Sequence, residues 1–334
     1  MTVSVSKALS RGKPAARAVP VLPESGTHEK FKRLLAAAQR QPAVITAVVH
    51  PCDEVSLKGA IEAARLKLIV PILVGPSARI REVATRSSLD IGGFEIVDAA
   101  HSHDSAAKAV ELVRSGKAEA LMKGSLHTDE LMGAVVSREG GLRTSRRISH
   151  CFVLDVPGQP NAIIITDAAV NIAPTLEEKV DIIQNAIDLA HVITQSEVRV
   201  AILSAMETVN PKVPSTVEAA ALCKMADRGQ ITGAVLDGPL ALDNAVSLEA
   251  VAVKKIDSPV AGRANVLVVP DLAAGNMLAK SLFILAGADG AGVVLGARVP
   301  IILTSRADAL LTRLASCAVA VLLAASRRAS KAVM

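Results

Sequence analysis

The chain has 334 residues, of which 51% are hydrophobic and 21% charged, and its mean hydropathy is +0.41. This composition excludes a disordered chain, and the length allows about two domains with well-filled cores. The longest apolar run, Leu314 to Ala325, is shorter than the roughly 20 residues of a membrane-spanning helix, so it predicts a buried helix and no membrane partner. Aromatic residues make up only 1%, which counts against modules that stack single-stranded nucleic acid on aromatic rings.

The formal net charge of +5 comes mainly from the first residues of the chain. Four basic residues precede the first acid, Glu24, and without them 33 basic residues face 32 acidic ones. These four are Lys7, Arg11, Lys13 and Arg17. We therefore expect residues 1–24 to form a flexible basic N-terminal arm, with an organellar transit peptide as the alternative, and we expect no nucleic-acid partner.

The four cysteines lie far apart in the sequence and form no CxxC pair. They are Cys52, Cys151, Cys223 and Cys317. In a chain of this length, such spacing indicates reduced, buried thiols and a cytoplasmic protein rather than a disulfide framework.

Short β-branched runs alternate with longer amphipathic stretches along the chain, which predicts an α/β fold with a parallel sheet flanked by helices. The expected strands are 43–49, 68–74, 95–97, 120–122, 151–155, 162–166, 198–203, 233–236, 266–269 and 301–303. The expected helices are 57–66, 106–114, 129–136, 177–192, 216–226, 248–254, 277–285 and 309–323.

A polar stretch from Ser137 to His150 separates two α/β halves and contains four arginines, Arg143 among them. A cleft between two such halves is a common ligand site, because strand ends and helix N-termini converge there. The arginines would then face an anion, although a solvated basic stretch is the alternative.

The segment after the last expected strand carries Ser305, Arg306 and Asp308 immediately before a helix. Free N–H groups at a helix N-terminus bind anions, Ser305 could donate to an oxyanion, and Arg306 matches the geometry of a phosphate. The competing interpretation is a capped helix with Asp308 complementing the helix dipole and Arg306 in solvent.

Three further polar turns follow expected strands. The first offers Lys123 and Thr128 to a polyanion, with capping by Thr128 or Asp129 as the alternative. The second contains Gly238, which allows close backbone approach. The third contains Asp271, Gly275 and Asn276. We expect these turns to share one carboxyl-terminal rim of the sheet and to form one cleft.

Nucleotide and metal fingerprints are absent from the sequence. It contains no GxxxxGK[ST] loop and no GxGxxG after the first expected strand. The histidines of His50-Pro-Cys52-Asp53 and His101-Ser-His103 have no second cluster at metal-ligand spacing. We therefore expect no metal and no cofactor.

Three segments carry a resemblance to the phosphate acetyl/butyryltransferase family from about Phe31 to Leu323. They are Ala264-Asn-Val-Leu-Val-Val-Pro-Asp-Leu-Ala-Ala-Gly-Asn276, Gly238-Pro-Leu-Ala-Leu-Asp243 and Thr304-Ser-Arg306. The resemblance implies two α/β domains of the isocitrate/isopropylmalate dehydrogenase type. The first comprises residues 25–150 plus 300–334 and the second 151–299, with the cleft between them. It also implies a homodimer that needs no metal.

The resemblance further implies interconversion of acyl-CoA and phosphate with acyl phosphate and CoA in a ternary complex, with acetyl favoured over butyryl. Ser305 would stabilise the oxyanion, and Arg306 would contact phosphate or CoA. The family's acetyl subtype has an aspartate seven residues after this serine, where this chain has Thr312. The base is therefore either Asp308 or the surroundings of the CoA thiol.

Several alternatives remain open from the sequence. The segments around Lys123, Arg143 and His150 are similar to the butyryl branch of the family. A non-catalytic acyl-CoA-sensing domain is consistent with Thr312. A metal- and NAD-dependent dehydrogenase would need a ligand cluster that the sequence lacks, and an enzyme acting on acyl carrier protein would need a basic docking surface.

Overall fold

The computed structural model describes residues 29–194, 197–304 and 308–332. Within these ranges one mixed sheet has the strand order β3-β2-β1-β4-β11-β10-β5-β6-β9-β7-β8. Its strands are β1 Val44–Val49, β2 Ile69–Gly75, β3 Glu95–Asp98, β4 Ala120–Lys123, β5 Ser149–Asp155, β6 Ile163–Thr166, β7 Arg199–Leu203, β8 Val235–Leu240, β9 Val266–Val268, β10 Asp289–Leu295 and β11 Ile301–Ile302. This arrangement confirms the α/β class with a largely parallel, mixed sheet.

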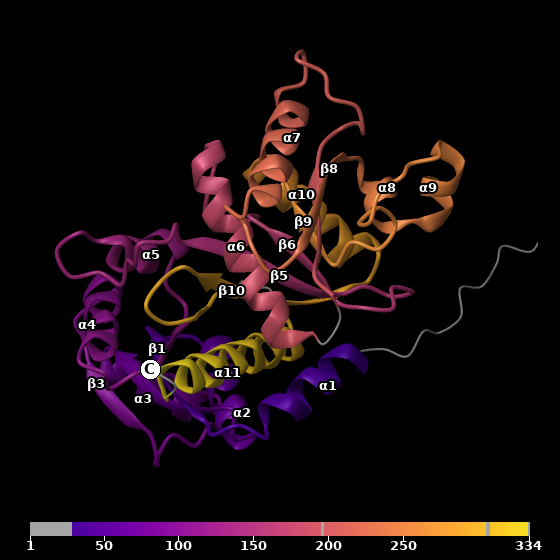
Figure 1. Ribbon diagram of the computed structural model, residues 1–334. Coiled ribbons are helices and arrows are strands. Elements are labelled where there is room, and N and C mark those ends of the chain that lie inside the picture. Colours follow the sequence, from indigo (N-terminus) through magenta and orange to yellow (C-terminus); the bar gives the residue numbers. More distant parts are fainter. Residues whose placement is uncertain (1–28, 195–196, 305–307, 333–334) are drawn as a thin grey trace, which may run out of the picture.

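Helices cover both faces of the sheet (Figure 1). They are α1 Glu29–Ala38, α2 Glu54–Arg65, α3 Ser77–Arg86, α4 Ser102–Arg114, α5 Thr128–Val136, α6 Leu176–Ile193, α7 Pro214–Asp227, α8 Leu242–Val246, α9 Leu248–Lys254, α10 Leu272–Leu285 and α11 Leu310–Ala332. The expected strands and helices are all present, with shifted ends. Three helices, α1, α3 and α8, and one strand, β10, were not predicted.

The helices form one continuous layer on one face and two groups on the other. Helices α1, α2, α3, α6, α7 and α11 contribute to a single apolar cluster that runs along one face. On the opposite face, α4 and α5 cover the first half of the sheet, and α8, α9 and α10 cover the second half. The face opposite α11 therefore carries two separate clusters, which meet at the central strands.

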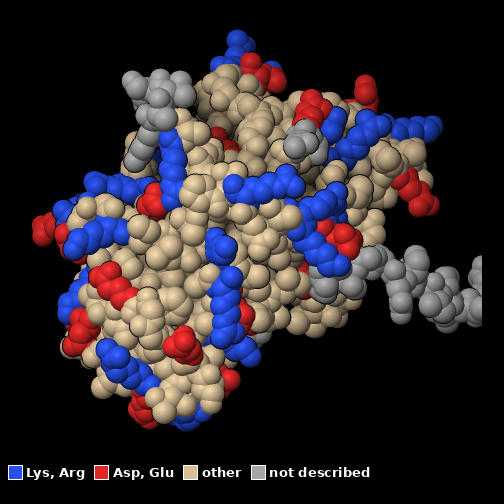
Figure 2. Space-filling view, turned by 90° about the horizontal axis from the view of Figure 1, so that it is seen from below, with Lys and Arg blue, Asp and Glu red and all other residues tan. Residues whose placement is uncertain are grey.

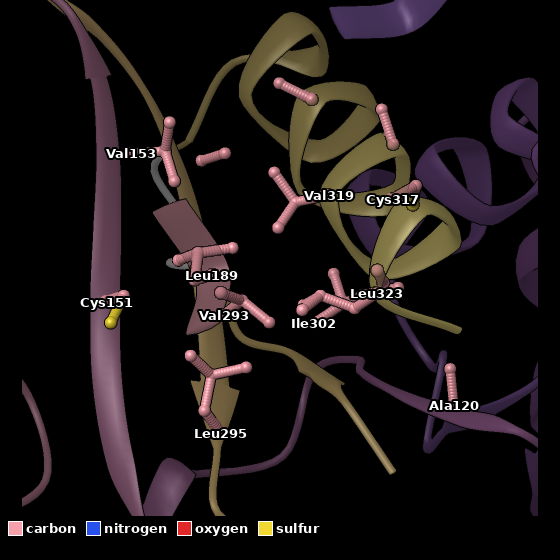
Figure 3. Packing of buried hydrophobic residues seen from close by; sticks show 14 of the residues in the cluster. Ala120, Cys151, Val153, Leu189, Val293, Leu295, Ile302, Cys317, Val319 and Leu323 are labelled. Atoms are coloured by element: carbon pink, nitrogen blue, oxygen red, sulfur yellow. The ribbon is translucent and has the colours of Figure 1, made fainter. Parts of the chain in front are cut away.

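Helix α11 is the buried helix that the run from Leu314 to Ala325 predicted. Its segment Leu310–Ser330 is long and apolar enough to span a membrane by length and composition, but 61% of its 18-residue apolar window is buried within the protein. Val319 and Leu323 pack against Val293 and Ile302 of the central strands (Figure 3). We conclude that α11 is a core helix of the sheet.

The strands of the two halves point in opposite directions. Strands β1, β2, β3, β4 and β11 are parallel to one another, and β6, β7, β8 and β9 form a second parallel set. The central strands β10 and β5 pair antiparallel with β11, with each other and with β6, so the direction reverses between the sets. The expectation that all polar turns share one carboxyl-terminal rim is therefore wrong, because sequence alternation does not reveal this reversal.

One face of the molecule carries charged side chains of both signs. On the face seen from below, Lys and Arg side chains are interspersed with Asp and Glu side chains (Figure 2). The 33 basic and 32 acidic residues outside the N-terminal basic group agree with this balance.

Candidate active site

Lys123 lies at the end of β4, beside the end of β11. The two strands are parallel neighbours, with Ile302 opposite Met122. The Lys123 side chain is buried, and its Nζ donates to the carbonyl oxygens of Gly124 at 3.2 Å and Leu126 at 3.1 Å. Carbonyl oxygens orient this ammonium group, so it is a fixed positive charge next to the strand end.

Thr304 continues β11 and accepts a hydrogen bond from a buried guanidinium. Arg313 of α11 is 3% exposed, and its Nη1 donates to Thr304 Oγ1 at 3.0 Å. Burial lowers the pKa of Arg313, while the charges of Asp308 and Asp53 act in the opposite direction. The sequence did not single out Arg313, because its place depends on α11 packing behind β11.

Asp308 lies just before α11, half-buried, where its charge acts on Arg313. Ser305 and Arg306, the other two residues predicted at this turn, lie outside the described residues. Their proposed roles therefore stay predictions.

Thr128 and Arg143 are not brought together with Thr304 by any described contact. Thr128 is the half-buried first residue of α5, and the N-cap is His127, whose N–H donates to Glu130 Oε2 at 2.8 Å. Capping by Thr128 or Asp129 is thus not observed. Arg143 is exposed and forms an isolated antiparallel β-bridge with Ala297. Ala297 precedes β11, whereas Thr304 follows it.

Gly238 lies in β8, at the outer edge of the sheet. A Cβ atom there would come within 2.7 Å of the carbonyl oxygen of Ile202 in β7. The close approach that the glycine permits is therefore a contact between neighbouring strands.

Asp271, Gly275 and Asn276 start helix α10 and fasten it to the turn after β6. The carboxylate of Asp271 caps the helix by accepting from the N–H of Ala274 at 2.8 Å. A Cβ atom on Gly275 would lie 2.9 Å from the carbonyl oxygen of Asp167, so only glycine fits there. Asn276 Nδ2 donates to the carbonyl oxygen of Ala168 at 3.3 Å.

The turn after β6 is organised by Asp167, which is 3% exposed. Its carboxylate accepts hydrogen bonds from the backbone N–H groups of Ala169, Val170 and Asn171, and from the Asn171 side chain at 2.6 Å. It also accepts from the N–H of His150 in β5 at 3.0 Å. Asp167 was not predicted as a site residue, although it directly follows an expected strand as the other polar turns do.

Metal ligands do not gather anywhere in the described ranges: no group of three His, Cys, Asp or Glu side chains could hold an ion there. His101 instead caps α4 by accepting from the N–H of Asp104, and His50 Nδ1 lies 3.0 Å from Ser105 Oγ. The expectation that no metal is needed stays a prediction.

A separate cavity of about 1330 Å³ lies among α4, α6 and α11, and none of the predicted site residues lines it. Two of its charged residues pair with each other, since Arg328 forms an ion pair with Glu119. We place the candidate site at the end of β11 instead, because Lys123, Thr304 and Arg313 lie around that strand end.

Comparison with known proteins connects these motifs to a family. The family model described as phosphate acetyl/butaryl transferase matches residues 99–321. The phosphate acetyltransferase of Rhizobium meliloti is 65% identical over 302 residues, which cover 90% of this chain and 96% of that protein. The phosphate butyryltransferase of Clostridium beijerinckii is 40% identical over 300 residues, which cover 90% and 99%.

A solved structure agrees with this assignment. The crystal structure of a branched-chain phosphotransacylase from Enterococcus faecalis V583 superimposes with a TM-score of 0.73 at 30% identity, over 84% of this chain and 99% of that chain. The described motif residues lie in the matched segment, together with the predicted Ser305 and Arg306. The chain belongs to the phosphate acetyl/butaryl transferase family.

Proposed function

We propose that this protein interconverts an acyl-CoA and inorganic phosphate with an acyl phosphate and CoA, and that acetyl is the favoured acyl group. The observation that carries this proposal is the 65% identity to a phosphate acetyltransferase over nine-tenths of the chain. Identity to a phosphate butyryltransferase is lower, at 40%, which supports the preference for acetyl.

The proposed chemistry is a direct transfer within a ternary complex. An oxygen of hydrogen phosphate attacks the thioester carbonyl, and the C–S bond breaks as the tetrahedral intermediate collapses. The CoA sulfur leaves as a thiolate, which takes up the proton that the phosphate loses. Holding both substrates together lowers the entropic part of the barrier, and no covalent acyl-enzyme is needed.

The predicted roles of individual residues follow from this chemistry. Ser305 donates to the developing oxyanion, and Arg306 binds phosphate or CoA. Asp308 is the carboxylate closest in sequence to this pair; it passes a proton to the departing thiolate in this direction and acts as the base for the CoA thiol in the reverse direction. The buried cations Lys123 and Arg313, which flank the end of β11, support this assignment because they favour anions nearby.

We further propose a homodimer in the cytoplasm. Helix α10 exposes apolar side chains, with Met277 64%, Ile284 80% and Leu285 83% exposed, and a second copy would cover them. All four cysteines are free thiols, which suits a reducing compartment. The molecular mass in solution, measured by light scattering, tests the dimer.

The decisive experiment is a thiol-release assay with acetyl-CoA and butyryl-CoA, each with and without phosphate, on the wild type and on Ser305→Ala. We expect strictly phosphate-dependent release, faster with acetyl-CoA, and a loss of about a hundredfold or more in the variant. Initial rates measured over both substrates should give intersecting double-reciprocal lines, whereas parallel lines would indicate a covalent intermediate. Binding of acetyl-CoA without turnover would favour the sensing alternative instead.

A further inference from the structure

The cavity of about 1330 Å³ among α4, α6 and α11 lies at the starts of β4 and β11. Glu119, directly before β4, and Arg298, shortly before β11, both line it. Lys123 and Thr304 of the candidate active site lie at the opposite ends of the same two strands. The cavity is therefore separate from that site, and the proposed reaction does not use it.

Arginines outnumber carboxylates in the lining of this cavity. Both carboxylates already have an arginine partner: Glu119 forms an ion pair with Arg328, and Asp188 lies 2.8 Å from Arg146, which is outside the lining. The lining therefore has an excess of positive charge that its own carboxylates do not neutralise. Its Arg, Asp and Glu residues are Arg114, Arg298, Arg327, Arg328, Glu119 and Asp188.

The guanidinium of Arg327 is held in place by carbonyl groups rather than by a carboxylate. Its Nη1 donates to the carbonyl oxygen of Arg298 at 2.9 Å, and its Nη2 donates to that of Ala297 at 3.4 Å. Burial lowers the pKa of Arg327, with the charge of Asp188 acting in the opposite direction. Arginine nevertheless stays charged at neutral pH, and Arg327 forms no ion pair with any residue that the structure describes.

Two further arginines add to this charge. The Arg298 side chain is exposed and forms neither a hydrogen bond nor an ion pair within the described ranges. Arg114 pairs at 3.4 Å with Glu111 of its own helix, and such an exposed pair stabilises little in water. Because a planar guanidinium matches a phosphate group through two hydrogen bonds, this lining favours a phosphate-bearing ligand.

The size and the walls of the cavity indicate the rest of the ligand. Its volume exceeds the roughly 300–1,000 Å³ of common small-molecule pockets, so it has room for much more than an inorganic ion. Leu189, Leu295 and Leu323 of the core cluster form part of its wall (Figure 3). None of the four phenylalanines lines it, and the sequence has no Trp or Tyr, so it offers no platform for stacking a nucleobase.

We propose that this cavity binds an organic phosphate with a non-aromatic body, such as a phosphorylated sugar, and that the phosphate group lies against Arg327 and Arg298. A phosphate monoester carries a charge of about −1.5 to −2 at pH 7, which two arginines balance. This site is additional to the proposed acyl transfer and does not depend on it.

Titration calorimetry of the full chain with ribose 5-phosphate tests the site, with ribose as the matched probe that lacks the phosphate. We expect the wild type to bind ribose 5-phosphate and not ribose. Arg298→Met and Arg327→Met each replace a guanidinium by an uncharged, unbranched side chain. Each should weaken the binding by about tenfold to a hundredfold, as for the loss of a hydrogen bond to a charged group.

Arg86→Met is the control for a general change in surface charge. The Arg86 side chain on α3 is 67% exposed and does not line the cavity, so this variant should bind ribose 5-phosphate as the wild type does. Arg298→Met also controls for misfolding. Because the Arg298 side chain makes no described contact, we expect this variant to keep the wild-type melting temperature even if the loss of two carbonyl contacts destabilises Arg327→Met.

The proposal is overturned if the wild type does not bind ribose 5-phosphate, or if it binds ribose equally well. Wild-type affinity in Arg298→Met would place the ligand elsewhere, including at the candidate active site, and would also overturn it. An equal loss in Arg86→Met would mean unspecific attraction between charges. The titration involves no acyl transfer, so its result is independent of whether the wild type releases CoA from acetyl-CoA.

Discussion

The side-chain amide of Asn276 donates a hydrogen bond to the backbone carbonyl of Ala168 across 108 positions of sequence. This bond joins the second turn of α10 to the turn after β6, where the Asp167 carboxylate accepts hydrogen bonds from backbone N–H groups. The family motif on α10 is thus fixed at its start by contact with a second, unpredicted turn.

We expect the replacement of Asn276 to reduce activity more than it reduces the stability of the fold. Asn276→Ala removes one hydrogen bond at a half-buried position, which we expect to lower the free energy of unfolding by about 1 kcal/mol. Because α10 would lose its register with the turn, kcat should fall about tenfold or more. Urea unfolding and the thiol-release assay measure the two effects.

Lys280→Ala serves as the control, because Lys280 is exposed on the same helix. It should leave both quantities unchanged. A loss of activity in this variant equal to that of Asn276→Ala would mean that the whole helix, rather than the contact made by Asn276, is responsible.

A second prediction concerns Gly292. In Gly292→Ala the added methyl group would lie 2.4 Å from the Leu303 carbonyl oxygen and 3.2 Å from His150 Nε2. Backbone cannot yield as a flexible side chain can, so we expect a loss of stability of about 1–3 kcal/mol, as for overpacking elsewhere. We also expect kcat to fall, since the end of β11 must move.

The matched control is Gly133→Ala in α5. A Cβ atom on Gly133 meets nothing within 4 Å, and alanine in a helix interior stabilises by about 0.5–1 kcal/mol relative to glycine. The two glycine-to-alanine changes should therefore shift the melting temperature in opposite directions. Shifts of the same sign would contradict the close approach at Gly292.

We expect the hydroxyl of Thr304 to contribute to the free energy of unfolding, because its hydrogen-bond partner is a buried guanidinium. In Thr304→Val the guanidinium of Arg313 loses an acceptor at 3.0 Å, which should cost about 1.5–3 kcal/mol of unfolding free energy. Thr85→Val, on the exposed face of α3, also removes a hydroxyl hydrogen bond, but it should change stability by less than about 0.5 kcal/mol. Urea denaturation of both variants measures the difference, and equal losses would refute it.

The sequence predicted elements whose pattern is local. Strand β1 is a mostly apolar run, so it was found without knowledge of its neighbours. Helix α10 was expected from residue 277 but begins at Leu272, and its cap Asp271 was predicted as a binding residue and not as a cap. Strand β10 was not predicted, because its glycines have low strand propensity. One of them, Gly292, is required by the approach of Leu303, a contact that only the tertiary structure defines.

The residues of the candidate site likewise fall into two groups, those predicted from the sequence and those that only the tertiary structure reveals. Lys123 and Asn276 were identified from polar turns and motif resemblance. Asp167 and Arg313 were not, because their roles depend on the reversal of strand direction at β5 and β10 and on the packing of α11. The order of strands along the sequence does not reveal that the strands of the two halves of the sheet point in opposite directions.

The buried imidazole of His150 should make stability depend on pH. Burial lowers its pKa to about 4 in the folded state, from the ordinary value of 6.5. Between about pH 6.5 and pH 4 the unfolded chain therefore binds a proton that the folded chain does not, so acidification favours unfolding. The contribution approaches about 1.4 kcal/mol per pH unit within this window and disappears above it.

Urea unfolding of the wild type and His150→Gln between pH 4.5 and pH 7.5, at intervals of about half a unit, isolates this contribution from those of other groups. The variant should become more stable relative to the wild type as the pH falls below about 6.5, because glutamine takes up no proton on unfolding. Cys151→Ala is the control, since it removes a fully buried side chain of the same strand whose thiol does not titrate in this range, and its loss of stability relative to the wild type should be the same at every pH. Parallel curves for the wild type and His150→Gln would show that the imidazole titrates in the folded protein as it does in the unfolded chain.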